Sequence, residues 1–141
     1  MPDTGVPVRW QPDRQPPAVP WPVPPLLTAI GRGIANRCPA CGQTQLFRGF
    51  LRVAPGCTAC GAPLGEIRAD DAPPYFVIIL TGHIVVPLMV LLEVWRHPPL
   101  WLHAAIFLPL TLILALGLLQ PVKGGIIGLM LRLGLFRRPA D

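Results

Sequence analysis

Charged residues are scarce in this chain: Asp, Glu, Lys and Arg make up 13% of its 141 residues, roughly half of the share usual in soluble domains. The apolar residues concentrate after residue 74, and the mean hydropathy is +0.52. A soluble globular core would spread them more evenly, so the composition indicates that lipid is part of the surroundings of the chain. The formal net charge of +5 then favours anionic phospholipid headgroups over nucleic acid as the charged partner.

The signatures of common enzyme sites are also missing. The chain contains no serine, which rules out a Ser-His-Asp triad, and it has no glycine loop of the phosphate-binding type. The adjacent Asp70 and Asp71 point in different directions and make a poor acid and base pair. We therefore expect no enzymatic activity and no small-molecule substrate. The first residues, Met1 to Gly5, lack the basic and apolar regions of a cleavable signal, so membrane insertion is expected to use internal segments.

The four cysteines of the chain lie close together and form two matching Cys-x-x-Cys-Gly knuckles. These are Cys38, Cys41 and Gly42 in the first, and Cys57, Cys60 and Gly61 in the second. A two-residue gap lets both thiolates of a turn reach one ion, and the glycine allows the positive φ with which the backbone turns away. Fifteen residues separate the pairs, which is typical of a four-thiolate zinc site.

Such a site has four protein ligands and no open position, so the metal is expected to stabilise a fold and not to catalyse. Iron in a rubredoxin-like site would use the same four ligands, so the sequence does not separate the two metals. Two disulfides, or one redox-active pair beside an incidental one, are the alternatives.

The segments around the knuckles have weaker patterns. Residues 1–25 contain nine prolines, which predicts an extended, disordered tail with no core of its own. Leu26 to Ala35 has apolar residues at helical spacing, which predicts a short helix leading into a zinc ribbon over residues 26–69. Leu46 to Ala54 favours one or two helical turns. Its phenylalanines either cover the ribbon core or touch a bilayer interface, with the neighbouring arginines at phosphates.

Two long apolar runs predict a transmembrane hairpin over residues 70–121, with spans at about 75–94 and 100–119. The uninterrupted runs have 18 and 20 residues, or about 27 and 30 Å of helix, which matches a hydrocarbon core of about 30 Å. Pro87 and Pro109 predict kinks. The connection between the spans is so short that the helices are expected to be antiparallel neighbours.

Basic residues predict the orientation of this hairpin. Five of them lie near the two outer ends of the spans, whereas Arg96 is the only one in the turn. The positive-inside rule therefore places both termini in the cytoplasm. A reducing compartment also keeps thiols free for metal, which argues against disulfides. Residues 122–141 are predicted to form a basic segment with a short interfacial helix on the inner leaflet.

Polar residues in and beside the spans are further candidates for function. His83 lies near mid-membrane, where an ionisable group is expensive; it either bonds a hydroxyl such as that of Thr111 or ligates a metal or cofactor. Asp71 and Lys123 flank the hairpin at its inner boundary. They either form an ion pair or act separately, as a helix N-cap and a snorkelling anchor.

A second polar group surrounds the turn between the spans. Glu93, His97 and His103 are grouped there. They can either bind a transition metal at the periplasmic edge of the membrane that the hairpin spans or be solvated turn residues.

These features together resemble a known bacterial family, domain of unknown function 983 (DUF983), whose members have a zinc ribbon before a two-helix membrane hairpin. The marks that match lie between residues 37 and 124: Arg37 to Gly42, Leu46 to Leu51, Cys57 to Gly61, Asp70 to Phe76 and Leu118 to Gly124. The family has no established activity. The resemblance implies the bacterial inner membrane as the location. It also implies a respiratory role, because some members resemble accessory genes for haem-copper oxidase assembly.

Three functions follow as hypotheses. The first is a non-enzymatic accessory or scaffold protein of a larger membrane complex, since two helices make a poor pore. The second is a thiol or metal-handling factor that uses one Cys pair, which predicts a low thiol pKa at one knuckle and a labile metal. The third is a membrane-tethered nucleic-acid ribbon. Between residues 37 and 71 four arginines face three acidic residues, too small an excess for a phosphate-binding stripe.

Overall fold

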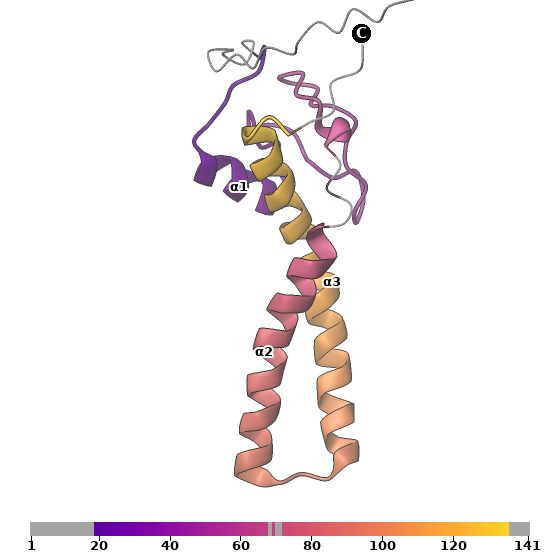
Figure 1. Cartoon of the computed structure of the whole chain (residues 1–141). Helices are drawn as coiled ribbons and strands as arrows, with labels where there is room; N and C mark the ends of the chain where they lie inside the picture. Colours follow the sequence, from indigo (N-terminus) through magenta and orange to yellow (C-terminus); the bar gives the residue numbers. More distant parts are fainter. Residues whose placement is uncertain (1–18, 68, 70–71, 136–141) are drawn as a thin grey trace, which may run out of the picture.

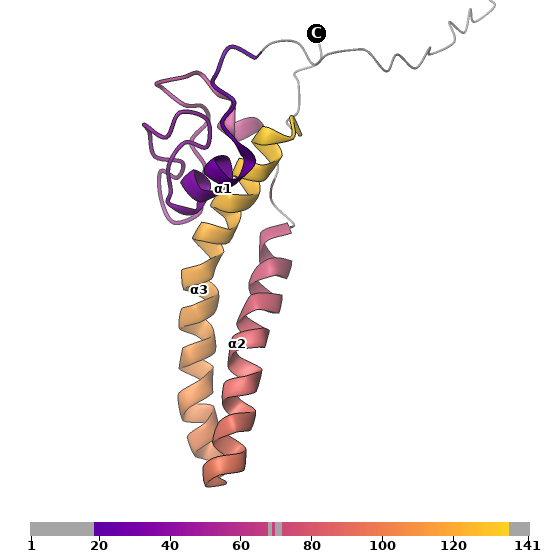
Figure 2. The same ribbon diagram turned by 90° about the vertical axis from the view of Figure 1, so that its left-hand side faces the viewer.

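The computed structural model describes residues 19–67, 69 and 72–135. Within these residues, three α-helices and one short 3-10 helix form in the order α1 (Leu26–Ile34), η1 (Leu64–Glu66), α2 (Ala72–Arg96) and α3 (Leu100–Arg132). Helices α2 and α3 make a long hairpin, and α1 lies with the cysteine-containing loops around the last turns of α3 (Figures 1 and 2). The predicted short helix before the cysteines is therefore confirmed, as are two long apolar helices after them.

The hairpin helices turn most of their apolar side chains outward. In the first part of α2, which packs along α3, the buried residues recur at every fourth position: Pro73, Val77, Thr81 and Val85. In the most apolar windows of α2 and α3, only 17% and 11% of the residues are buried, whereas the core helix of a soluble protein would bury most of them. Both helices are long and apolar enough to span a membrane.

Helix α3 differs from the prediction because it does not end near residue 119. It has 33 residues, or about 50 Å at 1.5 Å per residue, which exceeds a hydrocarbon core of about 30 Å. The helix continues through Pro121 to Arg132, so the separate interfacial helix predicted after residue 122 is wrong. Its last turns are held by protein contacts, because they pack between α1 and the cysteine-containing loops (Figure 1).

Glycines bring α1 and α3 unusually close. A Cβ atom built on Gly33 of α1 would meet the backbone carbonyl of Gly124, and one on Gly128 would meet that of Ala29. A Cβ on Gly125 would lie 3.2 Å from the Ile34 side chain. The helices therefore touch backbone to backbone, in the manner of small-residue helix contacts. The missing side chains of these glycines make the contact possible.

Residues 37–67, which we call the cysteine module, have little regular structure. Two isolated antiparallel bridges, Arg37–Gln45 and Phe47–Val53, are the paired backbone segments in its described part. The predicted helical turns over Leu46–Ala54 are wrong, because the segment doubles back through the second bridge. Leu46 and Phe47 are buried, which supports their predicted role in covering the ribbon, while Phe50 is 54% exposed.

The core of the cysteine module is completed by α3. Its buried cluster contains Leu46, Leu64, Ile67 and two cysteines from the module together with Ile127 and Leu131 from α3. Ile127 has no exposed surface. Residues 19–25 also differ from the predicted free tail, since Trp21 packs against this cluster. Residues 1–18 lie outside the described part of the chain.

Candidate metal centre

The two knuckles have the same backbone design. The amide of Gly42 donates to the carbonyl of Cys38 at 2.8 Å, and the amide of Gly61 donates to that of Cys57 at 2.9 Å. Both glycines have φ of +74°, in the left-handed region where a residue with a Cβ is strained by roughly 1–2 kcal/mol. The predicted role of the glycines is confirmed, because each reverses the chain directly after a cysteine pair.

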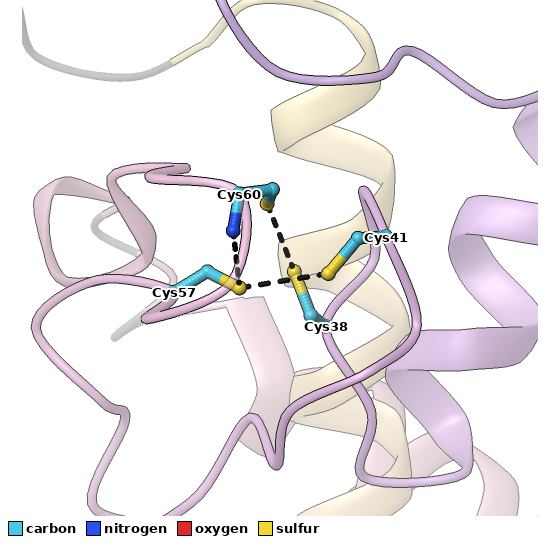
Figure 3. A group of neighbouring side chains, drawn as sticks. All are labelled: Cys38, Cys41, Cys57 and Cys60. Carbon is cyan, nitrogen blue, oxygen red and sulfur yellow. Dashed lines mark hydrogen bonds between the residues drawn. The ribbon is translucent and has the colours of Figure 1, made fainter.

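The four sulfurs point toward one another (Figure 3). The Sγ atoms of Cys38 and Cys60 are 3.9 Å apart and those of Cys41 and Cys57 are 3.6 Å apart. All four lie within 4.8 Å of one another, and all four cysteines are free of disulfides. In a tetrahedral site with bonds of about 2.3 Å, sulfurs are about 3.8 Å apart. The cluster can therefore hold a metal ion at its centre, with each knuckle supplying two ligands.

Two side chains that the sequence did not single out support the knuckles. The Arg32 guanidinium, in the last turn of α1, donates to the Ala40 carbonyl inside the first knuckle at 2.6 Å. The Thr44 hydroxyl lies 3.1 Å from the Cys57 sulfur and links the two halves of the site. A hydroxyl three residues after a Cys pair is the one sequence signal for Thr44. No local sequence pattern predicts the role of Arg32, because its contact with Ala40 depends on how α1 packs against the first knuckle.

The thiols differ in their readiness to ionise. Burial raises the pKa of Cys57, but hydrogen bonds from the Thr44 hydroxyl and from backbone amides outweigh burial and lower this pKa to about 6. Burial raises the pKa of Cys60 to about 12 and also raises that of Cys38. Cys57 is therefore the first of these thiols to ionise, and Cys38 and Cys60 resist a second negative charge beside it. A bound cation supplies the charge that lets all four ionise.

Comparison with known proteins places this architecture in a family. The family model "Protein of unknown function (DUF983)" matches residues 47–131, more than half of the chain. The chain belongs to this family. The match confirms the resemblance and includes the second knuckle and nearly all of α3, whereas the first knuckle precedes it. No curated protein and no solved structure matched the chain.

Two family marks that are distant in sequence meet in the structure. The Lys123 ammonium, from the segment ending at Gly124, donates to the Leu51 carbonyl at the tip of the loop between the knuckles, at 3.3 Å. Lys123 thus has a partner in the cysteine module. Asp71, its expected ion-pair partner, lies outside the described residues, so the predicted coupling between the two remains a prediction.

His83 does not make the predicted bond between helices. Its Nδ1 lies 2.7 Å from the Ile79 carbonyl, one turn earlier in α2, and the Thr111 hydroxyl donates to the Phe107 carbonyl in α3 at 2.6 Å. Each polar side chain is therefore satisfied by its own helix. His83 is exposed and lies in the wall of an apolar groove of about 590 Å³ between α1, α2 and α3, where it is the one ionisable side chain among the described lining residues.

Proposed function

We propose that this chain is a non-enzymatic accessory or scaffold protein of a membrane complex, in which a zinc-stabilised cysteine module is fixed to a transmembrane hairpin. The observation that carries the proposal is the shared helix α3. Its first part pairs with α2, and Ile127 and Leu131 near its end fill the core of the cysteine module. A metal that orders the module therefore also fixes α1 and the end of the hairpin relative to each other.

Zinc with four thiolates suits such a structural role. The ligand set is the one that structural zinc sites use, and it leaves no position for water or substrate. Helix α3 lies behind the site and α1, which packs against α3, lies beside it (Figure 3). We therefore assign the metal a role in folding and none in catalysis. Iron has the same ligand preference, and the metal content of the purified protein distinguishes the two.

We place the hairpin in the bacterial cytoplasmic membrane with both termini in the cytoplasm. The outward apolar surface of α2 and α3 requires lipid or another membrane protein to cover it. The basic residues near the outer ends of the spans support the orientation. Free thiols in a metal site also agree with a reducing compartment.

Reporter fusions test this topology. A reporter enzyme that is active only in the periplasm should work when it is fused after Arg96 and fail when it is fused after Asp141. The physical reason is that the basic ends remain on the cytoplasmic side. A cytoplasm-specific reporter at the same two positions is the control and should give the opposite pattern. Periplasmic activity at Asp141 would reverse the orientation and remove the compartment argument for free thiols.

A partner is expected because two helices alone make a poor pore, so a function in the membrane calls for a larger complex. After gentle detergent extraction, the tagged protein should carry a membrane protein with it in a fixed ratio, as identified by mass spectrometry. A Cys57→Ser variant should lose this companion, because the cysteine module no longer holds α3. Ala59→Ser, at an exposed position of the same knuckle, should keep it. A wild-type protein that migrates alone in mild detergent would reject the scaffold role.

The thiol or metal-handling function is the second candidate. The lowered pKa of Cys57 is the property it predicts, although a zinc-bound thiolate needs the same property. Metal release under mild chelation would favour this candidate, and retention would reject it.

Neither the structure nor the comparisons supports a link to haem-copper oxidase assembly. For a nucleic-acid role, a salt-dependent shift of DNA or RNA by the protein would be the supporting result.

A further inference from the structure

A second group of metal-ligating side chains lies at the closed end of the hairpin, at the opposite end from the cysteine module (Figure 1). Glu93 is in the last turn of α2, His97 follows the end of that helix, and His103 is in the first turn of α3. Among the described residues, the Glu93 carboxylate has ion-pair distances only to these two histidines. The group therefore combines one carboxylate with two imidazoles from both helices.

His103 is buried with its ring nitrogen unsatisfied. Its side chain is 7% exposed, and the ring stacks on Phe107 with centroids 5.9 Å apart. The Nε2 atom lies 3.3 Å from the Glu93 Oε2, yet their geometry makes no hydrogen bond, and no other residue that the structure describes is a partner for Nε2. A buried polar atom without a partner is expensive and calls for an explanation. The neighbouring Glu93 carboxylate is half-exposed, so an ion from solvent can reach the buried Nε2 of His103 beside it.

The distance between these two atoms suits a metal ion. In a tetrahedral zinc site with bonds of about 2.0–2.1 Å, neighbouring ligand atoms are about 3.3–3.4 Å apart. The separation of 3.3 Å between Nε2 of His103 and Oε2 of Glu93 equals this edge. One ion can therefore bind both atoms without a change in the distance between α2 and α3.

His97 is placed to become a third ligand. Its Nδ1 is 3.7 Å from the Glu93 Oε1, and its side chain is 78% exposed, so the ring is free to rotate toward the ion. The backbone at His97 is fixed more firmly: its φ is +43°, and its amide donates to the Glu93 carbonyl at 3.1 Å. The strained turn keeps the imidazole beside the carboxylate.

We propose that Glu93, His97 and His103 form a second metal site, which takes a divalent transition metal ion of the zinc class. Imidazole and carboxylate are ligands that zinc, copper and nickel accept, and two histidines with one glutamate leave a fourth position for water. Unlike the thiolate site, this site is open to solvent and its ion is exchangeable. A bound ion joins the end of α2 to the start of α3 and so locks the hairpin turn.

The test uses the full-length protein in detergent, with its cysteine site already loaded with zinc. Titration with Zn²⁺ in an isothermal calorimeter should show about one further ion per chain. His103→Gln should weaken this uptake by at least about 100-fold, and His97→Ala by about tenfold. His83→Gln, which changes a histidine elsewhere in α2, is the matched control and should bind like the wild type.

Glu93→Gln keeps the side-chain shape and serves as a second variant if His103→Gln does not fold. Retention of the thiolate-bound zinc and of the helical circular dichroism spectrum checks the fold of each variant. If the wild type takes up no further ion, Glu93 and His103 form an ion pair only and the proposal is overturned. Binding of wild-type strength in both His103→Gln and Glu93→Gln would overturn it equally.

Discussion

Replacement of Cys57 by serine is expected to remove the metal and unfold the cysteine module while α2 and the paired part of α3 stay helical. Binding of a structural zinc ion supplies about 10–16 kcal/mol, and a module of this size buries too little to fold without it. Serine is a much poorer zinc ligand than a thiolate at neutral pH. We therefore expect less than about one-tenth of the wild-type metal content, measured by elemental analysis of the purified protein.

Hydrogen exchange locates the unfolding that follows metal loss. Amides of the knuckles, such as those of Gly42 and Gly61, should lose protection in Cys57→Ser, whereas amides in the middle of α2 should not. Ala59→Ser places the same new residue two positions away at an exposed site and should retain both metal and protection. Full metal occupancy in Cys57→Ser would contradict the four-thiolate assignment.

Gly124→Ala is expected to destabilise the protein, whereas the same change at Gly117 of the same helix should not. A Cβ at residue 124 would overlap the Gly33 carbonyl of α1, so the two helices must separate. Overpacking of this kind typically costs about 1–3 kcal/mol. At Gly117 no atom of the described residues lies within 4 Å of the added Cβ, and alanine is favoured over glycine in a helix interior by up to about 1 kcal/mol.

Thermal unfolding in detergent measures this difference. Gly124→Ala should lower the unfolding midpoint and expose the amides of α1 to exchange, and Gly117→Ala should leave the midpoint unchanged or raise it. Gly128→Ala repeats the test at the next close contact, since its Cβ would meet the Ala29 carbonyl. Equal effects at residues 117 and 124 would mean that α1 does not depend on the glycine contact.

Local patterns predicted much of this structure. The knuckle spacing determined which four sulfurs converge, and the helical spacing from Leu26 determined α1, because in both cases neighbours in sequence decide the geometry. The long apolar runs likewise predicted α2 and the first part of α3. In each case a single segment contained the whole signal.

Features that depend on two distant segments could not be predicted in this way. The sequence predicted a separate interfacial helix after residue 122, because the close contact of Gly124 with α1 is visible only when Gly33 lies opposite it. The apolar residues of Leu46 to Ala54 have helical spacing, but the segment is not helical. Phe47 and Val53 form an antiparallel bridge, which requires the chain to turn back between them. The Arg32 bond to Ala40 and the Lys123 bond to Leu51 are likewise tertiary.

The sharing of α3 between the hairpin and the cysteine module has a consequence for the order of folding during synthesis. The ribosome releases all four cysteines before either long helix, yet the core that covers them includes Ile127 and Leu131, which come about 70 residues later than the second knuckle. The module cannot complete its core until α3, and with it the preceding α2, has been made. Burial of the metal site is therefore among the last events in the maturation of this chain, and an exposed site marks a hairpin that is still unfinished.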